Sequence, residues 1–298
     1  MANKGENRQT LTMGPDRLGL IAGGGEFPLL VTRGAKRAGL KVVCLGFRGL
    51  ADRQLAKEAD RFIWVGLARI GQWIRALKRE DIQRVIICGA VRKADMYQPY
   101  RWLRHIPDWR TARIWYRRSK DRRTDNLLLA LVDELAEEGI TMEDSVQFCK
   151  EDLAGTGALG SREASARQAQ DIAFGWKIAK AMGGLDIGQS VCVRELEVIA
   201  VEAIEGTDEA IRRAGQLCKV GGFTVVKVAK PQQDMRFDVP TVGCETLEVM
   251  HQAGAAVLAV ETGKTLIINR QKFCRLAGKY GLVVVGVADG QTENDRSG

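Results

Sequence analysis

Histidine is scarce in this chain, and cysteine lacks the spacing that metal sites need. Only His105 and His251 occur among 298 residues, which argues against a histidine-rich metal site or a histidine-based hydrolytic triad. The seven cysteines are odd in number, scattered, and without a C-x-x-C pair. We therefore expect free thiols in a reducing cytoplasm rather than disulfides or a zinc site.

Long apolar runs are also missing. No run approaches the roughly 18 residues that a membrane-spanning helix requires. Residues 1–16 are polar and have no signal-peptide core, so we interpret them as a flexible leader, and residues 290–298 as a flexible tail. Hydrophobic residues still make up 45% of the chain, which is enough for a sizeable core. Any membrane contact should therefore be peripheral and transient, at the inner face of the cytoplasmic membrane.

Acidic residues are outnumbered, 37 against 45 Lys and Arg, which gives a net charge of +8. A basic chain favours an anionic partner, such as nucleic acid, a phosphorylated substrate or an anionic membrane surface. The excess is uneven, because residues 101–123 hold nine Arg or Lys and only two Asp. The sequence thus predicts one basic patch.

An aromatic, basic segment, residues 97–118, overlaps this patch. Its tryptophans, Trp102, Trp109 and Trp115, recur at helical spacing between arginines, and Pro107 separates two helical pieces. Three interpretations stay open: a face on lipid headgroups or acyl chains, a nucleic-acid contact, or a helix that packs its tryptophans inward. No nucleic-acid-binding motif accompanies the segment, so we expect no nucleic-acid partner.

Residues 17–149 alternate between strand and helix in the manner of a Rossmann-like parallel sheet. We expect strands over residues 18–22, 41–45, 61–65 and 84–88, and helices over 26–38, 70–79 and 126–138.

Residues 150–289 have a different pattern of strands and helices, and this pattern predicts a second, C-terminal α/β domain that carries the catalytic groups. A glycine-rich stretch, 155–160, suggests a hinge between the halves. We expect helices over 163–182 and 207–218, strands over 190–194 and 197–202, and then strand, helix and strand through Val285. The fold class is α/β with a substrate cleft between the two domains.

A glycine loop joins the first strand to the first helix. Gly23, Gly24 and Gly25 let the backbone turn tightly and approach an anion at the helix N-terminus. Pro28 stands where the dinucleotide fingerprint has its third glycine, which disfavours a nicotinamide site. We expect a phosphate- or nucleotide-binding turn, with Gly89 after the fourth strand as a second contact, and a purely structural turn stays open.

The loop from Lys227 to Gly243 mixes acids and bases between two prolines. Asp234 and Asp238 alternate with Lys230 and Arg236. Such a loop suits a divalent metal ion that meets a phosphate. It equally suits a solvated surface loop with ion pairs, and the residues alone leave both interpretations open.

Five motifs in order resemble the metal-dependent UDP-2,3-diacylglucosamine pyrophosphatase family of lipid A biosynthesis. They lie at residues 18–28, 124–128, 186–189, 201–208 and 227–243. The resemblance implies two domains that close on a lipid-linked UDP-sugar, with Mg²⁺ required. The implied reaction is hydrolysis of the diphosphate to UMP and 2,3-diacylglucosamine 1-phosphate, with water attacking the phosphorus on the sugar side.

The family motifs assign roles to particular residues of this chain. They imply Asp238 or Asp234 as the catalytic and Mg²⁺-binding carboxylate, with Asp208 as a further catalytic residue. They also imply that Gln189 and Thr207 bind the substrate. The remaining substrate contacts expected are Lys230 and Arg236 at the phosphates and Gly23, Gly24, Gly25 and Gly89 in the glycine loops. Asn126 and Gln232 depart from the residues that family members often carry there, so the acyl and sugar specificity stays open.

The alternative function is a binding module for a nucleotide or phospholipid that has a Rossmann-like domain and no turnover. Loss of the lipid-linked nucleotide with Mg²⁺, stopped by a chelator, would discriminate the enzyme from this module. The sequence leaves the oligomeric state open, with a homodimer as one of the states considered.

Overall fold

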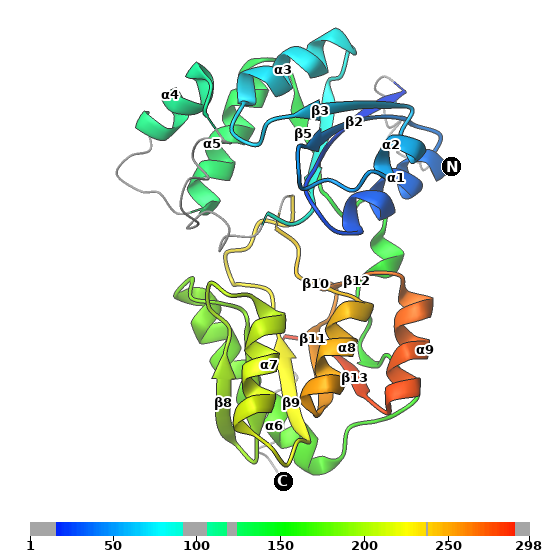
Figure 1. The fold of residues 1–298 in the computed structure, drawn as a ribbon, viewed down its shortest axis with the longest axis vertical. Coiled ribbons are helices and arrows are strands. Elements are labelled where there is room, and N and C mark those ends of the chain that lie inside the picture. The colour runs from blue at the N-terminus through cyan, green and yellow to red at the C-terminus, as the bar shows by residue number, and fades with distance from the viewer. Residues whose placement is uncertain (1–15, 92–105, 118–123, 237, 290–298) are drawn as a thin grey trace, which may run out of the picture.

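The computed structural model describes residues 16–91, 106–117, 124–236 and 238–289. Figure 1 shows two lobes, with the N-terminal sheet and its helices in one and the C-terminal sheet and its helices in the other.

The N-terminal sheet has five parallel strands in the order β3-β2-β1-β4-β5. Its three central strands are nearly continuous apolar runs, as expected for strands buried on both faces. The strands are β1 (Arg17–Ala22), β2 (Lys41–Phe47), β3 (Arg61–Val65), β4 (Arg84–Cys88) and β5 (Thr141–Met142), and the helices are α1 (Phe27–Arg37), α2 (Leu55–Glu58), α3 (Ile70–Arg79), α4 (Trp109–Arg117) and α5 (Thr124–Glu137).

The strand order reverses between β1 and β4, so the loops that follow these two strands lie side by side. Such a switch point is where open α/β sheets commonly bind ligands.

The C-terminal sheet has six strands in the order β6-β13-β11-β9-β7-β8. Strands β9, β11 and β13 are parallel, while β6, β7 and β8 run antiparallel to their neighbours. The strands are β6 (Gly157–Ala158), β7 (Ser190–Arg194), β8 (Glu197–Val201), β9 (Phe223–Lys227), β11 (Ala255–Glu261) and β13 (Val283–Val287). The helices are α6 (Ala166–Gly184), α7 (Thr207–Leu217), α8 (Cys244–Ala253) and α9 (Arg270–Tyr280).

Each face of this sheet has its own core. Helix α6 packs Ile172 and Trp176 against one face, where Val191 and Val226 are fully buried. Helices α7, α8 and α9 cover the opposite face, on which Phe273 is fully buried. The C-terminal half is therefore three layers, helix, sheet and helices.

The two halves share apolar contacts. A two-stranded sheet of β10 (Thr241–Val242) and β12 (Leu266–Ile267) lies near the junction, beside the 3-10 helix η3 (Lys150–Asp152). Leu266 and Ile268 belong to the same buried cluster as Leu20 of β1.

The predicted fold class is confirmed: the chain is α/β, with an N-terminal parallel sheet and a second sheet in the C-terminal half. The predicted helices and strands agree with the structure to within about three residues at their ends. The domain bounds 17–149 and 150–289 stay a prediction. The leader (apart from Asp16), the tail, and residues 97–105 and 118 of the aromatic, basic segment lie outside the described residues. Within the described ranges, no helix is long and apolar enough to cross a bilayer.

Candidate functional site

The C-terminal cavity is an open pocket of about 870 Å³ at one end of the six-stranded sheet. Five predicted site residues line it together: Gln189, Thr207, Asp208, Lys230 and Asp238. Its other lining residues are Asp186, Ile187, Gly188, Glu202, Ala203, Ile204, Glu205, Gly206, Glu209, Arg212, Lys227, Thr241, Glu245 and Thr246. All of them belong to the C-terminal half.

One wall of the cavity depends on the glycine at position 188. A β-carbon there would lie 2.1 Å from the backbone oxygen of Glu202, closer than two such atoms can approach. Only glycine lets the loop before β7 lie against the end of β8, where the backbone N–H of Glu202 donates to the Ser190 carbonyl at 2.9 Å. This packing brings Gln189 beside Glu202, and each has a buried side-chain oxygen that accepts no hydrogen bond from the described residues.

Lys227 ends β9 and places its ammonium group in the cavity wall. The residue is 93% buried, and its Nζ donates to Thr207 Oγ1 at 3.1 Å and to the Thr241 carbonyl at 2.9 Å. In the described part of the chain no carboxylate forms an ion pair with it. Because only neutral groups contact this buried ammonium group among the described residues, an anion can still pair with it, and Lys227 suits a phosphate.

The N-terminus of α7 opens onto the same cavity. Its N-cap is Gly206, with φ at 89°, and no side chain caps the first turn. Thr207 and Asp208 begin the helix, whose N-terminal N–H groups and dipole favour negative charge. The Thr207 hydroxyl also lies 3.3 Å from Ser190 Oγ, so β7, β9 and α7 meet at this hydroxyl.

The acids of the cavity outnumber its bases, and some already have partners. Asp186 pairs with Lys230, Glu209 with Arg212 at 2.6 Å, and Glu205 with Arg213 at 2.8 Å. The carboxylates of Asp208, Asp238 and Glu245 make no hydrogen bond or ion pair with the residues that the structure describes. These are the oxygens that a cation or an attacking water could use.

Asp234 and Asp238 differ in their surroundings, although both were predicted as metal ligands. The Arg236 guanidinium binds the Asp234 carboxylate through Nε at 3.0 Å and Nη2 at 2.6 Å, and this hydrogen bonding holds the pKa of Asp234 below its usual range. Asp234 and Arg236 do not line the cavity, whereas Asp238 does. The geometry favours Asp238, and the roles of all three residues stay predictions.

The loop between β9 and α8 is held from two sides. The backbone N–H of Ala229 donates to the buried carboxylate of Glu261 at 2.7 Å, and that carboxylate also accepts from Lys180 at 2.8 Å. From the N-terminal half, Ser145 Oγ donates to the Met235 carbonyl at 2.8 Å. The segment that carries Asp238 is therefore anchored to both halves of the molecule.

The glycine loops after β1 and β4 bind one another. Gly23 N–H donates to the Cys88 carbonyl at 2.9 Å, and Gly24 and Ala90 exchange hydrogen bonds of 3.0 and 2.8 Å. A β-carbon on Gly23 would lie 2.7 Å from the Gly89 oxygen, so close packing explains both glycines. The N–H groups of Gly23 and Gly24 already donate hydrogen bonds within the protein. Gly25, the third glycine of the loop, has a left-handed backbone conformation, with φ at 84°. Binding of substrate by Gly23, Gly24, Gly25 and Gly89 stays a prediction.

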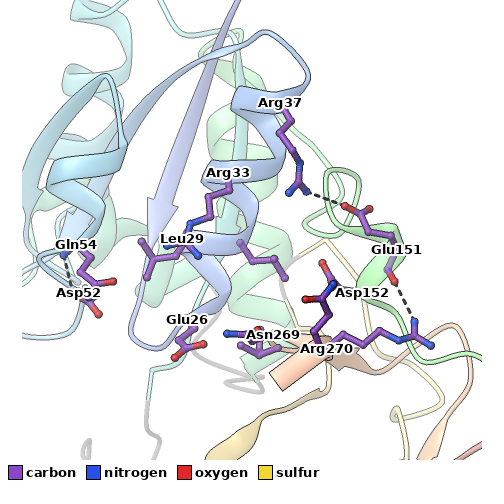
Figure 2. Close-up of a pocket in the computed structure, with 13 residues that line it drawn as sticks. Glu26, Leu29, Arg33, Arg37, Asp52, Gln54, Glu151, Asp152, Asn269 and Arg270 are labelled. Carbon is purple, nitrogen blue, oxygen red and sulfur yellow. Dashed lines mark hydrogen bonds and ion pairs between the residues drawn. The ribbon is translucent and has the colours of Figure 1, made fainter. Parts of the chain in front are cut away.

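A second pocket, the junction cavity, lies between the two halves and has a volume of about 560 Å³. Figure 2 shows Arg33 and Arg37 of α1 on one side, with Asp152, Asn269 and Arg270 on the other. Arg37 pairs with Glu151 at 2.9 Å across it. Burial, followed by the charge of Glu151, raises the pKa of Asp152. The predicted cleft between the halves corresponds to this pocket, yet none of the predicted site residues lines it.

No group of three His, Cys, Asp or Glu side chains lies close enough to hold a metal ion on its own, as far as the structure describes the chain. Mg²⁺ commonly needs only one or two carboxylates, because waters and substrate phosphates complete its coordination. Asp238 and Asp208 line one cavity with Lys227, and this donor set fits an ion that binds together with a diphosphate.

Sequence reasoning assigned no site role to Lys227, Glu202 or Glu245, which all line the cavity. A signal existed for Lys227, since it is a charged residue at the end of the apolar run 223–229. Glu245 gave none, because its place in the cavity depends on how α8 packs beside α7.

Comparison with known proteins assigns both halves of the chain to one family. The LpxI N-terminal domain model matches residues 17–151, and the LpxI C-terminal domain model matches residues 155–285. The chain is 32% identical over 283 residues to the UDP-2,3-diacylglucosamine pyrophosphatase LpxI of Caulobacter vibrioides, a match that covers 91% of this chain and 97% of that protein.

A solved structure of biotin carboxylase from Campylobacter jejuni aligns with 68% of this chain and 42% of its own chain. The TM-score is 0.26 and the identity 16%, too low to support an argument. The two domain matches and the full-length relative lead to one conclusion: the chain belongs to the LpxI family.

Proposed function

We propose that this protein hydrolyses the diphosphate of UDP-2,3-diacylglucosamine to UMP and 2,3-diacylglucosamine 1-phosphate, in a Mg²⁺-dependent step of lipid A biosynthesis. The observation that carries the proposal is the convergence of Gln189, Thr207, Asp208, Lys230 and Asp238 on one cavity in a chain of this family. The relative from Caulobacter, named for this pyrophosphatase activity, supports the substrate class.

The cavity supplies what a diphosphate requires. The negative charge of a diphosphate repels an incoming nucleophile, so a site must neutralise the phosphates before water can attack. Lys227, the Thr207 hydroxyl and the N-terminus of α7 point to one place in the cavity wall and would hold a phosphate there. Lys230 lies within reach of the same space, and Asp186 orients its ammonium group.

Asp238 is the carboxylate that we assign to the attacking water. Water would add to the phosphorus on the sugar side, Asp238 would accept its proton, and the bond to the bridging oxygen would break to release UMP. When bound by Asp238 and Asp208, Mg²⁺ would neutralise the phosphate oxygens. Asp234, by contrast, would hold Arg236 and shape the loop.

Exchange of single carboxylates tests this assignment. We expect Asp238→Asn to lower kcat by about a hundredfold or more while substrate still binds, because general-base groups typically contribute 10²–10⁴-fold. Glu197→Gln, which replaces an exposed carboxylate on β8, is the matched control and should keep wild-type activity. The assay follows UMP release with Mg²⁺ and with a chelator, and heavy-oxygen water should label the lipid phosphate.

Full activity of Asp238→Asn would refute its role. If the wild-type protein bound the substrate and released no UMP with Mg²⁺, the binding-module alternative would replace the enzyme.

The cellular setting is part of the same proposal. A lipid-linked UDP-sugar is partly embedded in the bilayer, so the protein would work in the cytoplasm and make transient contact with the inner membrane surface. The buried thiols fit a reducing compartment. A homodimer is compatible with this setting, and sedimentation velocity would decide the oligomeric state.

A further inference from the structure

Helix α4 is fixed to the N-terminal half along one side. Asp108 precedes the helix, and its carboxylate accepts from the Thr111 N–H at 3.0 Å and the Thr111 hydroxyl at 2.8 Å. The Asp108 N–H donates to the Ala68 carbonyl at 3.1 Å, and Ile114 is buried in the core around α3. The helix is therefore a firmly held part of the fold.

The arginines of this helix strengthen that attachment. Arg113 binds both carboxylate oxygens of Glu134 at 2.8 Å, and Arg110 pairs with Glu134 and Glu138 of the α5 region. Glu134 is buried, so these pairs lie at the base of the helix rather than on its outer surface.

The opposite side of α4 exposes large apolar side chains. Trp109 is 82% exposed and Tyr116 is 83% exposed, and Trp115 and the preceding Ile106 are each more than half exposed. Figure 1 shows α4 at the outer edge of its lobe, packed beside α3 and α5. Inward packing of the tryptophans, one of the three interpretations of this segment, does not hold for Trp109 and Trp115.

The chemistry of this face fits a lipid headgroup layer better than a dry protein interface. Tryptophan and tyrosine combine an apolar ring with a polar group, and both concentrate where water meets hydrocarbon. Besides Arg110 and Arg113, which pair with acids of the α5 region, the sequence has seven Arg or Lys between positions 101 and 123 and two Asp, an excess of positive charge that favours anionic lipids.

We propose that the exposed face of α4, formed by Ile106, Trp109, Trp115 and Tyr116, docks on an anionic bilayer surface. The aromatic rings would enter the headgroup region. The proposal extends the proposed function, because a diacylated substrate reaches the enzyme at a membrane, and its test requires no turnover.

Vesicle sedimentation with the full-length protein tests the proposal. Wild-type protein should bind phosphatidylcholine vesicles that contain phosphatidylglycerol, and bind less to phosphatidylcholine alone or at high salt. Trp109→Ser combined with Tyr116→Ser should weaken the binding by about tenfold or more, because two interfacial anchors are lost. The matched control, Leu217→Ser with Val220→Ser, removes exposed apolar groups near the end of α7 and should bind as wild type.

The outcomes separate this surface from its alternatives. Circular dichroism and thermal unfolding should show that both double variants are folded. Absence of wild-type binding, or equal binding by the α4 variant, would overturn the proposal. A lipid-free dimer that the α4 variant loses would assign this face to a second copy of the chain instead. Failure of hydrolysis with intact vesicle binding would refute only the proposed function.

Discussion

Lys227 brings a full positive charge into the interior of the C-terminal half, with two neutral oxygens as its hydrogen-bond partners. Removing a charge from water costs free energy, which two hydrogen bonds to neutral oxygens offset less well than an anion would. A residue in this position serves ligand binding better than it serves stability.

Lys227→Met should therefore separate activity from folding. Hydrogen bonds to charged groups contribute about 1.5–3 kcal/mol, so kcat/KM should fall by about 10–100-fold. The free energy of unfolding should change little, because the methionine side chain fills the space without the desolvation cost. UMP release and urea unfolding measure the two effects, and Lys177→Met on the exposed side of α6 is the control. A large loss of stability with unchanged kcat/KM would show that Lys227 is structural.

Asp234 contributes to stability in a way that depends on pH. Its pKa is lowered by Arg236, so the contribution is present above the unfolded-state value near ~3.9 and is lost as the pH falls through the folded-state value. We expect Asp234→Asn to be less stable than wild type at neutral pH by about 1 kcal/mol or less, since the pair is partly exposed. Urea unfolding at neutral and strongly acidic pH should show the difference vanish in acid. A difference that is constant with pH would contradict the ion-pair explanation.

At the scale of elements, periodicity and composition predict the longer helices and strands because each shows a repeating apolar pattern. The strands β5, β6, β10 and β12 have only two residues each, too short for any pattern, and they were not predicted. Residues 186–189, 202–209 and 227–246 meet through strand order, which local sequence does not encode. Three of the five motifs, residues 186–189, 201–208 and 227–243, contribute side chains to the C-terminal cavity, but only the packing shows that Asp238 lines it while Asp234 binds Arg236.

The contact between the loop before β7 and the end of β8 makes a sharp test of the cavity wall. Gly188→Ala should destabilise the protein by about 1–3 kcal/mol, because the added carbon overlaps the Glu202 backbone. It should also lower activity, since Gln189 moves with the loop. Gly184→Ala, where an added β-carbon meets nothing within 4 Å, is the matched control. Thermal unfolding measures the loss of stability, and UMP release measures the loss of activity. Equal stability and activity of the two variants would show that the backbone at Glu202 moves to accept the added carbon.

At the scale of the whole molecule, the reactivity of the cysteines indicates how readily the cores of the two halves open. Burial raises the pKa of Cys44, Cys149 and Cys192 to about 12, and that of Cys88 also rises with burial. Thiolates are the reactive species, so these four should resist alkylation in the native protein near neutral pH. Mass spectrometry should find label first at Cys218 and Cys274, later at the half-buried Cys244, whose pKa burial also raises, and at all seven after unfolding. Rapid native labelling of Cys44 or Cys192 would indicate that its core opens readily.

The hydrogen bond from Ser145 to Met235 has a consequence for how the chain could be divided. A fragment that begins at residue 155 would keep every side chain of the C-terminal cavity and lose the Ser145 donor. All the chemical groups would be present, while the loop that carries Asp238 would lose its hydrogen bond to the N-terminal half and keep those within the C-terminal half, from Ala229 to Glu261 and from Leu266 to the Pro240 carbonyl. The N-terminal half thus supports one loop of a cavity whose lining residues all lie in the other half. We expect co-expression of the two halves to restore this support without a covalent link.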